Sequence, residues 1–285
     1  MKASLVLCTR NRAAQLERCL ASIARLNFER GRELILVDNG STDDTGALIR
    51  DFAADVGFPV IPVYEARPGL GRARNAGLAA ARGEIIVFTD DDCYPLHDFL
   101  DRVVEAFTLP ELGYLGGAIR LYDPSDAALT ISYLTESRVL PPRRFLWPGL
   151  VQGANMAFRR AALDEIGGFD PGFGPGTPFV ADDIDAAARA SAAGWTGLFL
   201  AEAVVLHDHG RKAGDAKRLL EIYDRGRGAY YAKLLLDAAT RRPFAARILA
   251  ELCRSALRRP RALGRELKGA LDYLRSQGDA GAAAA

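Results

Sequence analysis

Three sets of acidic residues follow apolar or glycine-rich runs of the sequence, where side chains that bind metals or move protons are often found. They are Asp38 at the end of LILVD; Asp90, Asp91 and Asp92 at the end of EIIVFTDDD; and Asp182, Asp183 and Asp185 after the loop GGFDPGFGPGTP. A single Asp at such a place is commonly a helix cap or a turn residue. Three adjacent carboxylates repel one another, however, and a divalent cation is their natural compensating charge.

The middle set predicts both the kind of ion and the kind of substrate. Asp90 and Asp92 are alternate residues of the turn and can point to the same side, and ligand sets made of oxygen favour Mg²⁺ or Mn²⁺. A metal held by one or two carboxylates typically completes its shell with substrate phosphates. The sequence therefore predicts a phosphate-bearing substrate at these acids.

The segment EARPGLGRARNAG, which precedes the triple-Asp run, offers groups that bind anions. Gly69 and Gly71 allow close backbone approach before a predicted helix, whose N-terminus attracts negative charge. Arg67, Arg72 and Arg74 add donors for charge-assisted hydrogen bonds. The segment matches neither the dinucleotide fingerprint nor the Walker pattern, so its position before the acids is what suggests phosphate binding.

The elements that position these residues alternate along the first 120 residues. Apolar runs predict strands over 4–8, 33–37, 60–64, 84–89 and 114–121. Helical spacing predicts helices over 13–26, 45–54 and 71–81. This alternation predicts an α/β fold with a mostly parallel, Rossmann-like central sheet flanked by helices, whose ligand site lies beyond the carboxyl ends of the strands.

The rest of the chain is less regular. Residues 123–149 predict a long loop, in which the ring of Trp147 could stack on an acceptor. Later elements are predicted at 151–158 and 197–206 (strands) and at 183–193, 215–239, 244–258 and 262–275 (helices). The final GDAGAAAA predicts disorder.

Composition limits the class of protein. No apolar run approaches the ~18 residues that a membrane span needs, and Leu5–Cys8 is too short for a signal peptide core, so we expect a cytoplasmic protein. The four cysteines form no CxxC pair, which predicts reduced thiols rather than disulfides or a zinc site.

Charge divides unevenly along the chain, although the net charge is only +1. Residues 201–285 hold 17 of the 37 basic and 10 of the 36 acidic side chains, which leaves a basic C-terminal part and an acidic body. Within 241–275, ten side chains are basic and three are acidic. Basic amphipathic helices can lie on an anionic membrane, here at its inner face; docking on the rest of the chain or on a second copy in a homodimer is the alternative.

Six segments, in their order along the chain, resemble those of family 2 glycosyltransferases of the GT-A fold, over roughly residues 3–210. They are LVLCTRNR, LILVDNGSTDDT, RPGLGRARNAG, FTDDDC, QGANMAFRR and ADDID. The resemblance implies metal-dependent transfer of a sugar from a UDP, GDP or dTDP donor to a glycan, a lipid-linked or a small-molecule acceptor, as in the synthesis of cell-envelope polysaccharide. The division that it implies is a catalytic domain over 1–210, with a nucleotide-binding half (1–120) and an acceptor half (121–210), then a basic helical extension over 211–277 and a tail over 278–285.

The same resemblance implies roles for individual residues. Those that would bind the nucleotide sugar are Thr9, Arg10, Asn11, Arg12, Asp38, Asn39, Gly71, Arg74, Asn75, Asp90, Asp91, Gly153 and Asn155. Asp90 and Asp92 would be the acids of the DXD motif, with Asp92 the direct metal ligand and Asp90 nearer the ribose. His207 would complete the metal shell, with His209 as the second candidate.

The reaction also needs a base for the acceptor hydroxyl, opposite the leaving diphosphate. By resemblance this base is Asp183, the second acid of the family's Glu-Asp pair. Asp182 replaces the usual Glu here, so Asp182 and Asp185 stay open as alternatives. A single base opposite the leaving group fits inversion at the anomeric carbon.

Two other functions are compatible with the acids. A nucleotide-sugar-binding protein without turnover would keep the donor site and need no base. A phosphatase that forms an aspartyl phosphate also places two acids after a strand, but usually after its first strand, whereas Asp90 follows the fourth predicted one. Nucleic-acid binding is not expected, because the basic segment lacks interleaved aromatic residues.

Overall fold

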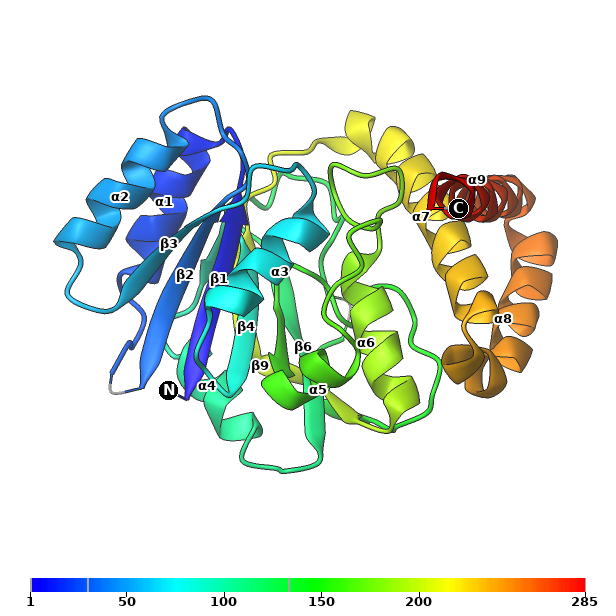
Figure 1. Ribbon diagram of the computed structural model, residues 1–285, viewed down its shortest axis with the longest axis horizontal. Coiled ribbons are helices and arrows are strands. Elements are labelled where there is room, and N and C mark those ends of the chain that lie inside the picture. The colour runs from blue at the N-terminus through cyan, green and yellow to red at the C-terminus, as the bar shows by residue number, and fades with distance from the viewer. Residues whose placement is uncertain (1, 30, 133, 285) are drawn as a thin grey trace.

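The computed structural model describes residues 2–29, 31–132 and 134–284, and its elements form one sheet with helices on both faces (Figure 1). The strands are β1 Ala3–Thr9, β2 Arg32–Asp38, β3 Val60–Tyr64, β4 Ile85–Asp90, β5 Cys93–Pro95, β6 Leu112–Leu121, β7 Arg138–Leu140, β8 Met156–Arg159 and β9 Thr196–His207. The helices are α1 Ala13–Ile23, α2 Thr45–Asp55, α3 Leu70–Ala80, α4 Phe99–Ala106, α5 Arg160–Glu165, α6 Asp182–Ala193, η1 Ala213–Asp215, α7 Ala216–Leu236, α8 Ala238–Arg258 and α9 Pro260–Ala284.

The sheet confirms the predicted α/β architecture. Its order is β3-β2-β1-β4-β8-β6-β9-β5, and β7 pairs with β9 beside this path. The first four strands in that order are mutually parallel, and so are β6 and β9. Strand β8 runs antiparallel between β4 and β6, and β5 and β7 run antiparallel to β9.

Both faces of the sheet are buried, which explains the continuous apolar runs of its strands. In β1, Leu5 and Leu7 pack in one hydrophobic cluster with residues of α1 and α4. Val6, between them, packs in a second cluster with Ala73 of α3 and with residues of α5 and α6. Alternate side chains of one strand thus contribute to two cores.

Several segments differ from the sequence prediction. The strand predicted at 151–158 is confined to β8, because the N–H of Asn155 bonds to the carbonyl of Gln152 and closes a turn before it. Elements β5, β7 and α5 are short and lack a clear period, so the sequence did not indicate them. Helix α4 has apolar residues at helical spacing (Phe99, Leu100 and Val103), a signal that the sequence prediction missed. Residues 278–285, predicted to be disordered, are helical as far as Ala284, since alanine has the highest helix propensity; Ala285 lies outside the described residues.

The three C-terminal helices belong to the same folded core as the sheet. In Figure 1 they lie beyond α6, with α9 across α7. Tyr230 of α7, Phe244 of α8 and Tyr273 of α9 join the cluster that contains Val6 of β1. Part of the basic excess is neutralised here: Arg265 and Arg227 pair with Asp224, and Arg227 also pairs with Glu266.

Glycines allow α7 and α9 to cross at close range. A Cβ atom at Gly228 of α7 would overlap the backbone carbonyl of Glu266, and one at Gly269 of α9 would overlap that of Arg225. The two backbones are therefore in direct contact at the crossing. Any larger residue there must separate the helices.

We expect Gly228→Ala to destabilise the protein by about 3 kcal/mol, the upper end of the range for overpacking, because backbone atoms cannot move aside as a side chain can. The measurement is chemical denaturation. The matched control is Gly264→Ala on α9, where a Cβ meets nothing within 4 Å and the added helix propensity should leave stability equal or slightly higher. Equal stability of the two variants would contradict the contact.

Candidate functional site

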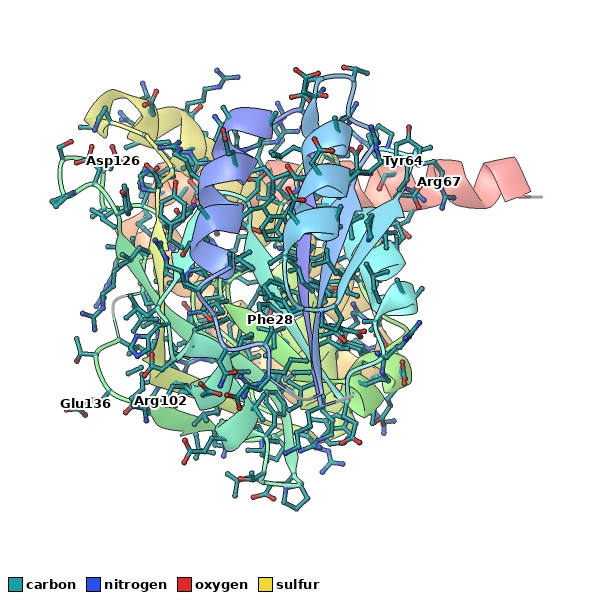
Figure 2. All side chains as sticks on the ribbon, turned by 90° about the vertical axis from the view of Figure 1, so that its left-hand side faces the viewer. Phe28, Tyr64, Arg67, Arg102, Asp126 and Glu136 are labelled. Carbon is teal, nitrogen blue, oxygen red and sulfur yellow. The ribbon has the colours of Figure 1, made fainter. Side chains whose placement is uncertain are left out.

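The carboxyl ends of β1, β2 and β4 meet at one edge of the sheet. Thr9 pairs in register with Asp38, and Cys8 with Asp90. Figure 2 shows Tyr64 and Asp126 at the same upper end of the molecule. Two of the three predicted sets of acids, at Asp38 and at Asp90, thus start from neighbouring strand ends, and the third opens helix α6.

The three side chains of the triple-Asp turn have different partners. Asp91 turns back towards β1 and accepts a hydrogen bond from Thr9 Oγ1 at 2.6 Å. Asp90 lies 3.5 Å from Arg74. Asp92 Oδ1 lies 3.3 Å from His207 Nε2. Asp91 and Thr9 therefore bond to each other inside the protein. Asp90 lies next to Arg74 instead, and Asp92 lies next to His207.

Arg12, just before α1, bridges two of these acids. Its Nε lies 2.9 Å from Asp91 Oδ1, and its Nη2 lies 2.8 Å from Asp92 Oδ2. Burial raises the pKa of Asp91 to about 7, although Arg12 opposes the shift. Burial acts on Asp92 too, but the hydrogen bond and charge of His207 and the charge of Arg12 outweigh it and hold the pKa of Asp92 below its usual value. Asp92 is therefore the ionised member of the pair.

Asp92 and His207 form a donor pair that fits a metal ion. Together with Cys93 they are the group of described side chains close enough to share one ion. Burial raises the pKa of the Cys93 thiol well above its usual value, and a sulfur ligand suits Mg²⁺ or Mn²⁺ less well than oxygen or imidazole does. A carboxylate and an imidazole remain, which together with phosphate oxygens suit a cation such as Mn²⁺.

His209 does not share this position. Its side chain is fully buried and its Nδ1 accepts the backbone N–H of Arg211 at 3.0 Å. Its nearest carboxylate is Asp126, at 3.6 Å. Of the two candidate histidines, His207 is the one that faces the triple-Asp turn.

Arg74, on α3, lies between the two groups of acids. Its guanidinium bonds to Asp182 at the start of α6 and lies 3.5 Å from Asp90 at the end of β4. The side chain is only 3% exposed and lies against the ring of Phe169, 5.5 Å from its centroid. The buried guanidinium also requires a glycine at position 153, because a Cβ atom there would overlap it.

Asp183 is the acid of α6 that remains partly exposed. Its Oδ2 accepts the backbone N–H of Gly153 at 2.8 Å, and its Oδ1 accepts that of Ile184 at 2.7 Å. Burial, and then the charge of Asp182, raise the pKa of Asp183 to about 6. The group can therefore accept a proton near neutral pH.

Asp185, the third candidate base, is fully buried, and one of its oxygens binds two cations. Its Oδ2 lies 2.8 Å from Lys233 Nζ of α7 and 2.9 Å from Arg189 Nη2. Lys233 also binds Asp170 at 2.6 Å. These contacts join α6 to α7 and disfavour Asp185 as a base.

Four residues predicted to bind the nucleotide sugar instead make contacts within the protein. The Asn39 amide bonds to the backbone of Glu65, Arg67 and Gly69, which shapes the loop before α3. Three further cases are Asn75, which bonds to both backbone groups of Phe169; Asn155, whose amide donates to Ala118 and Ala203; and Gly71, where a Cβ would lie 2.6 Å from the carbonyl of Asp170.

The remaining predicted residues border the strand ends. Asn11 Oδ1 accepts the N–H of Thr42 at 2.7 Å and joins the first two loops. Asp38 Oδ1 accepts the N–H of Ser41 at 2.8 Å. Arg10 is exposed.

Sequence patterns did not indicate Tyr223 of α7. Burial, and then the charges of Asp183 and Asp90, raise its pKa, although Arg211 lowers it. The charges of both acids therefore reach its phenol. The sequence of a helix that begins nine residues after β9 has no local signal of such an influence.

Comparisons with known proteins agree with this arrangement. Residues 4–167 match the family model described as glycosyl transferase family 2. The chain is 24% identical over 243 residues to glycosyltransferase AglE of Haloferax volcanii, which covers 85% of this chain and 77% of that protein.

Two solved structures share the fold. The mannosyltransferase PcManGT from Pyrobaculum calidifontis, in complex with GDP-Man and Mn²⁺, has a TM-score of 0.70 and 24% identity, over 94% of this chain and 73% of that one. S. aureus TarS in complex with UDP-GlcNAc has a TM-score of 0.62 and 18% identity, over 82% and 67%.

We expect Arg74→Met to cost about 3–5 kcal/mol of stability, because it leaves the buried Asp182 carboxylate unpaired. Denaturant unfolding measures the loss. Adding Asp182→Asn should restore part of it, since the double variant no longer buries that charge. A single variant as stable as the wild type, or a double variant with additive losses, would contradict the pairing.

Proposed function

The chain belongs to glycosyltransferase family 2 and is a glycosyltransferase, and on that premise we propose that it transfers a sugar from a nucleoside diphosphate to an acceptor hydroxyl with the help of Mg²⁺ or Mn²⁺ and with inversion. The observation that carries the proposal is the position of Arg74. One side of its guanidinium faces Asp90 of the triple-Asp turn, and the other faces Asp182, next to Asp183. This position supports a diphosphate site at one carboxylate and a base site near the other, with Arg74 between them.

In this proposal one end of the site binds the metal ion and the donor, and the other end accepts the proton of the acceptor. Asp92 and His207 would hold the ion, which would supply a Lewis acid to stabilise charge on the departing diphosphate. Asp90 would lie on the nucleoside side of the donor. Arg12 contacts Asp91 and Asp92, and its guanidinium would also be available to donate to phosphate oxygens of the donor.

Asp183 is the proposed base. It receives the proton of the acceptor hydroxyl as that oxygen attacks the anomeric carbon and the bond to the diphosphate breaks. The N–H groups of Gly153 and Ile184 orient its carboxylate. Its raised pKa makes it a stronger base than an ordinary aspartate.

The donor is proposed to carry UDP, GDP or dTDP. The solved relatives bind GDP-Man with Mn²⁺ and UDP-GlcNAc, which supports a nucleotide sugar and a divalent ion without choosing between the bases. A thermal-shift screen of nucleotide sugars with Mn²⁺ identifies the donor. Stabilisation by one donor that depends on the ion is the expected result.

We expect Asp183→Asn to lower kcat about 10²–10⁴-fold, the usual range for a general base. In the wild type, kcat/KM should rise with pH to a plateau above about 6, because Asp183 must lose its proton before it can act. Steady-state transfer assays over a pH series measure both. The control is Asp164→Asn, at an exposed aspartate of α5, and this variant should behave as the wild type. Unchanged turnover in Asp183→Asn would refute the assignment.

We also propose that α8 and α9 rest on an anionic membrane surface, which suits a lipid-linked acceptor and a place at the inner face of the cell membrane. No helix among the described residues is long and apolar enough to cross a membrane. The exposed leucines of the two helices are Leu249, Leu257, Leu267, Leu271 and Leu274. The exposed charged residues of α8 are all basic, so a second copy packed on this face would oppose like charges, whereas anionic lipid would attract them.

We expect the wild type to co-sediment with vesicles that contain anionic lipid and much less with neutral ones. Replacing Leu267, Leu271 and Leu274 together by Gln should release it, because these leucines lie on one helical face. Leu109→Gln, an exposed leucine outside these helices, is the control and should still bind. Equal sedimentation of the triple variant would disprove the contact. Point variants are preferable to truncation, because α8 contributes Phe244 and Ile248 to the core.

A further inference from the structure

Thr130 lies in the loop after β6 and contacts the proposed metal ligand His207. Its Oγ1 is 3.3 Å from His207 Nδ1. Its backbone φ is +52°, in the left-handed region that β-branched residues strongly avoid. A threonine held in that conformation suggests that its side chain is needed where it stands.

The hydroxyl of Thr130 has one hydrogen, and its destination can be assigned. Thr130 Oγ1 lies 2.7 Å from the carbonyl oxygen of Leu129, which can only accept. The hydroxyl hydrogen therefore belongs to that bond. Towards His207 the oxygen can only accept, so the hydrogen between them must be on His207 Nδ1.

The position of this hydrogen determines whether the other ring nitrogen, Nε2, carries a lone pair. A neutral ring with its hydrogen on Nδ1 has a lone pair on Nε2. That nitrogen lies 3.3 Å from Asp92 Oδ1, which is also an acceptor when the carboxyl is ionised. A second proton on Nε2 fills this gap when the ring is protonated and donates to Asp92. In the neutral ring the two lone pairs repel each other unless a metal cation lies between them.

We propose that Thr130 is a positioning residue, which holds His207 in the Nδ1–H tautomer and so presents the Nε2 lone pair to the divalent ion that Asp92 also binds. The inference rests on the metal-binding role proposed for His207. Histidine ligands commonly donate their second N–H to an oxygen of the protein, which sets the ring's orientation. Here that oxygen would come from a loop, 77 residues away in the sequence.

The loop that carries Thr130 is anchored on both sides, which is how the unfavourable φ is maintained. On one side, Ser132 bonds to Ile119 of β6 through its backbone N–H and its hydroxyl. On the other, the N–H of Ala127 bonds to the carbonyl of Arg211, beyond the end of β9. Thr130 is thus held between β6 and the segment that follows β9, the strand that ends at His207.

Thr130→Val tests the proposal, because valine keeps the β-branched shape and removes the hydroxyl. Thr130→Ser is the matched control, which keeps the hydroxyl. The first measurement is the set of ¹⁵N shifts of the imidazoles in metal-free protein, at a pH where they are neutral; with only three histidines, His207 can be resolved. The second is the affinity for Mn²⁺, from the EPR signal of the free ion. Thermal melting checks that each variant is folded.

The wild type and the Ser variant should show His207 with its hydrogen on Nδ1 and equal affinity for Mn²⁺. The Val variant should show a mixture of tautomers and bind Mn²⁺ about 10–100-fold more weakly, as expected for loss of a ligand's supporting hydrogen bond. An unchanged tautomer or unchanged affinity in the Val variant, or equal losses in both variants, would overturn the inference while the metal role stands. If the wild type itself binds no Mn²⁺, the proposed metal role fails first.

Discussion

A single buried guanidinium constrains the whole site. Arg74 needs two carboxylates to offset its burial, and it receives them from β4 and from α6. A charge removed from water tolerates little displacement of its partners. The end of β4 and the start of α6 are thereby held together, although more than ninety residues separate them. Gly153 is small because the guanidinium occupies the space of its side chain.

One residue type serves several purposes here because each aspartate has different surroundings. Asp185 lies between Arg189 and Lys233, and its ion pair with Lys233 joins α6 to α7. Asp183 has only backbone donors and a neighbouring carboxylate, so it keeps a high proton affinity. Asp92 lies beside Arg12 and His207, which favour its ionised form. The environment, rather than the residue type, separates an acid that pairs with cations, an acid that holds a proton tightly and an acid that stays ionised.

Much of the fold could be predicted from the sequence, because strands buried on both faces are continuous apolar runs and helices begin after polar turns. The grouping of the acids also followed, since parallel strands end at one edge. The partners of polar side chains could not be predicted. Asn39, Asn75 and Asn155 are consistent with ligand binding by type, yet their amides bond to backbone groups from other segments. Only the folded chain brings these segments together, and the same is true of Thr130 and His207.

The crossing of α7 and α9 prevents the C-terminal helices from being exchanged separately from the sheet. Gly226 of α7 packs against Val180, three residues before Asp183, while Gly228 on the same helix contacts α9. The outermost helix and the loop that leads to Asp183 at the start of α6 are therefore linked through one rigid element. A chimera that joins this sheet to another protein's C-terminal helices would have to bring the matching glycines and the Val180 loop with it. The unit that can be exchanged between relatives is the whole chain through α9, not the sheet alone.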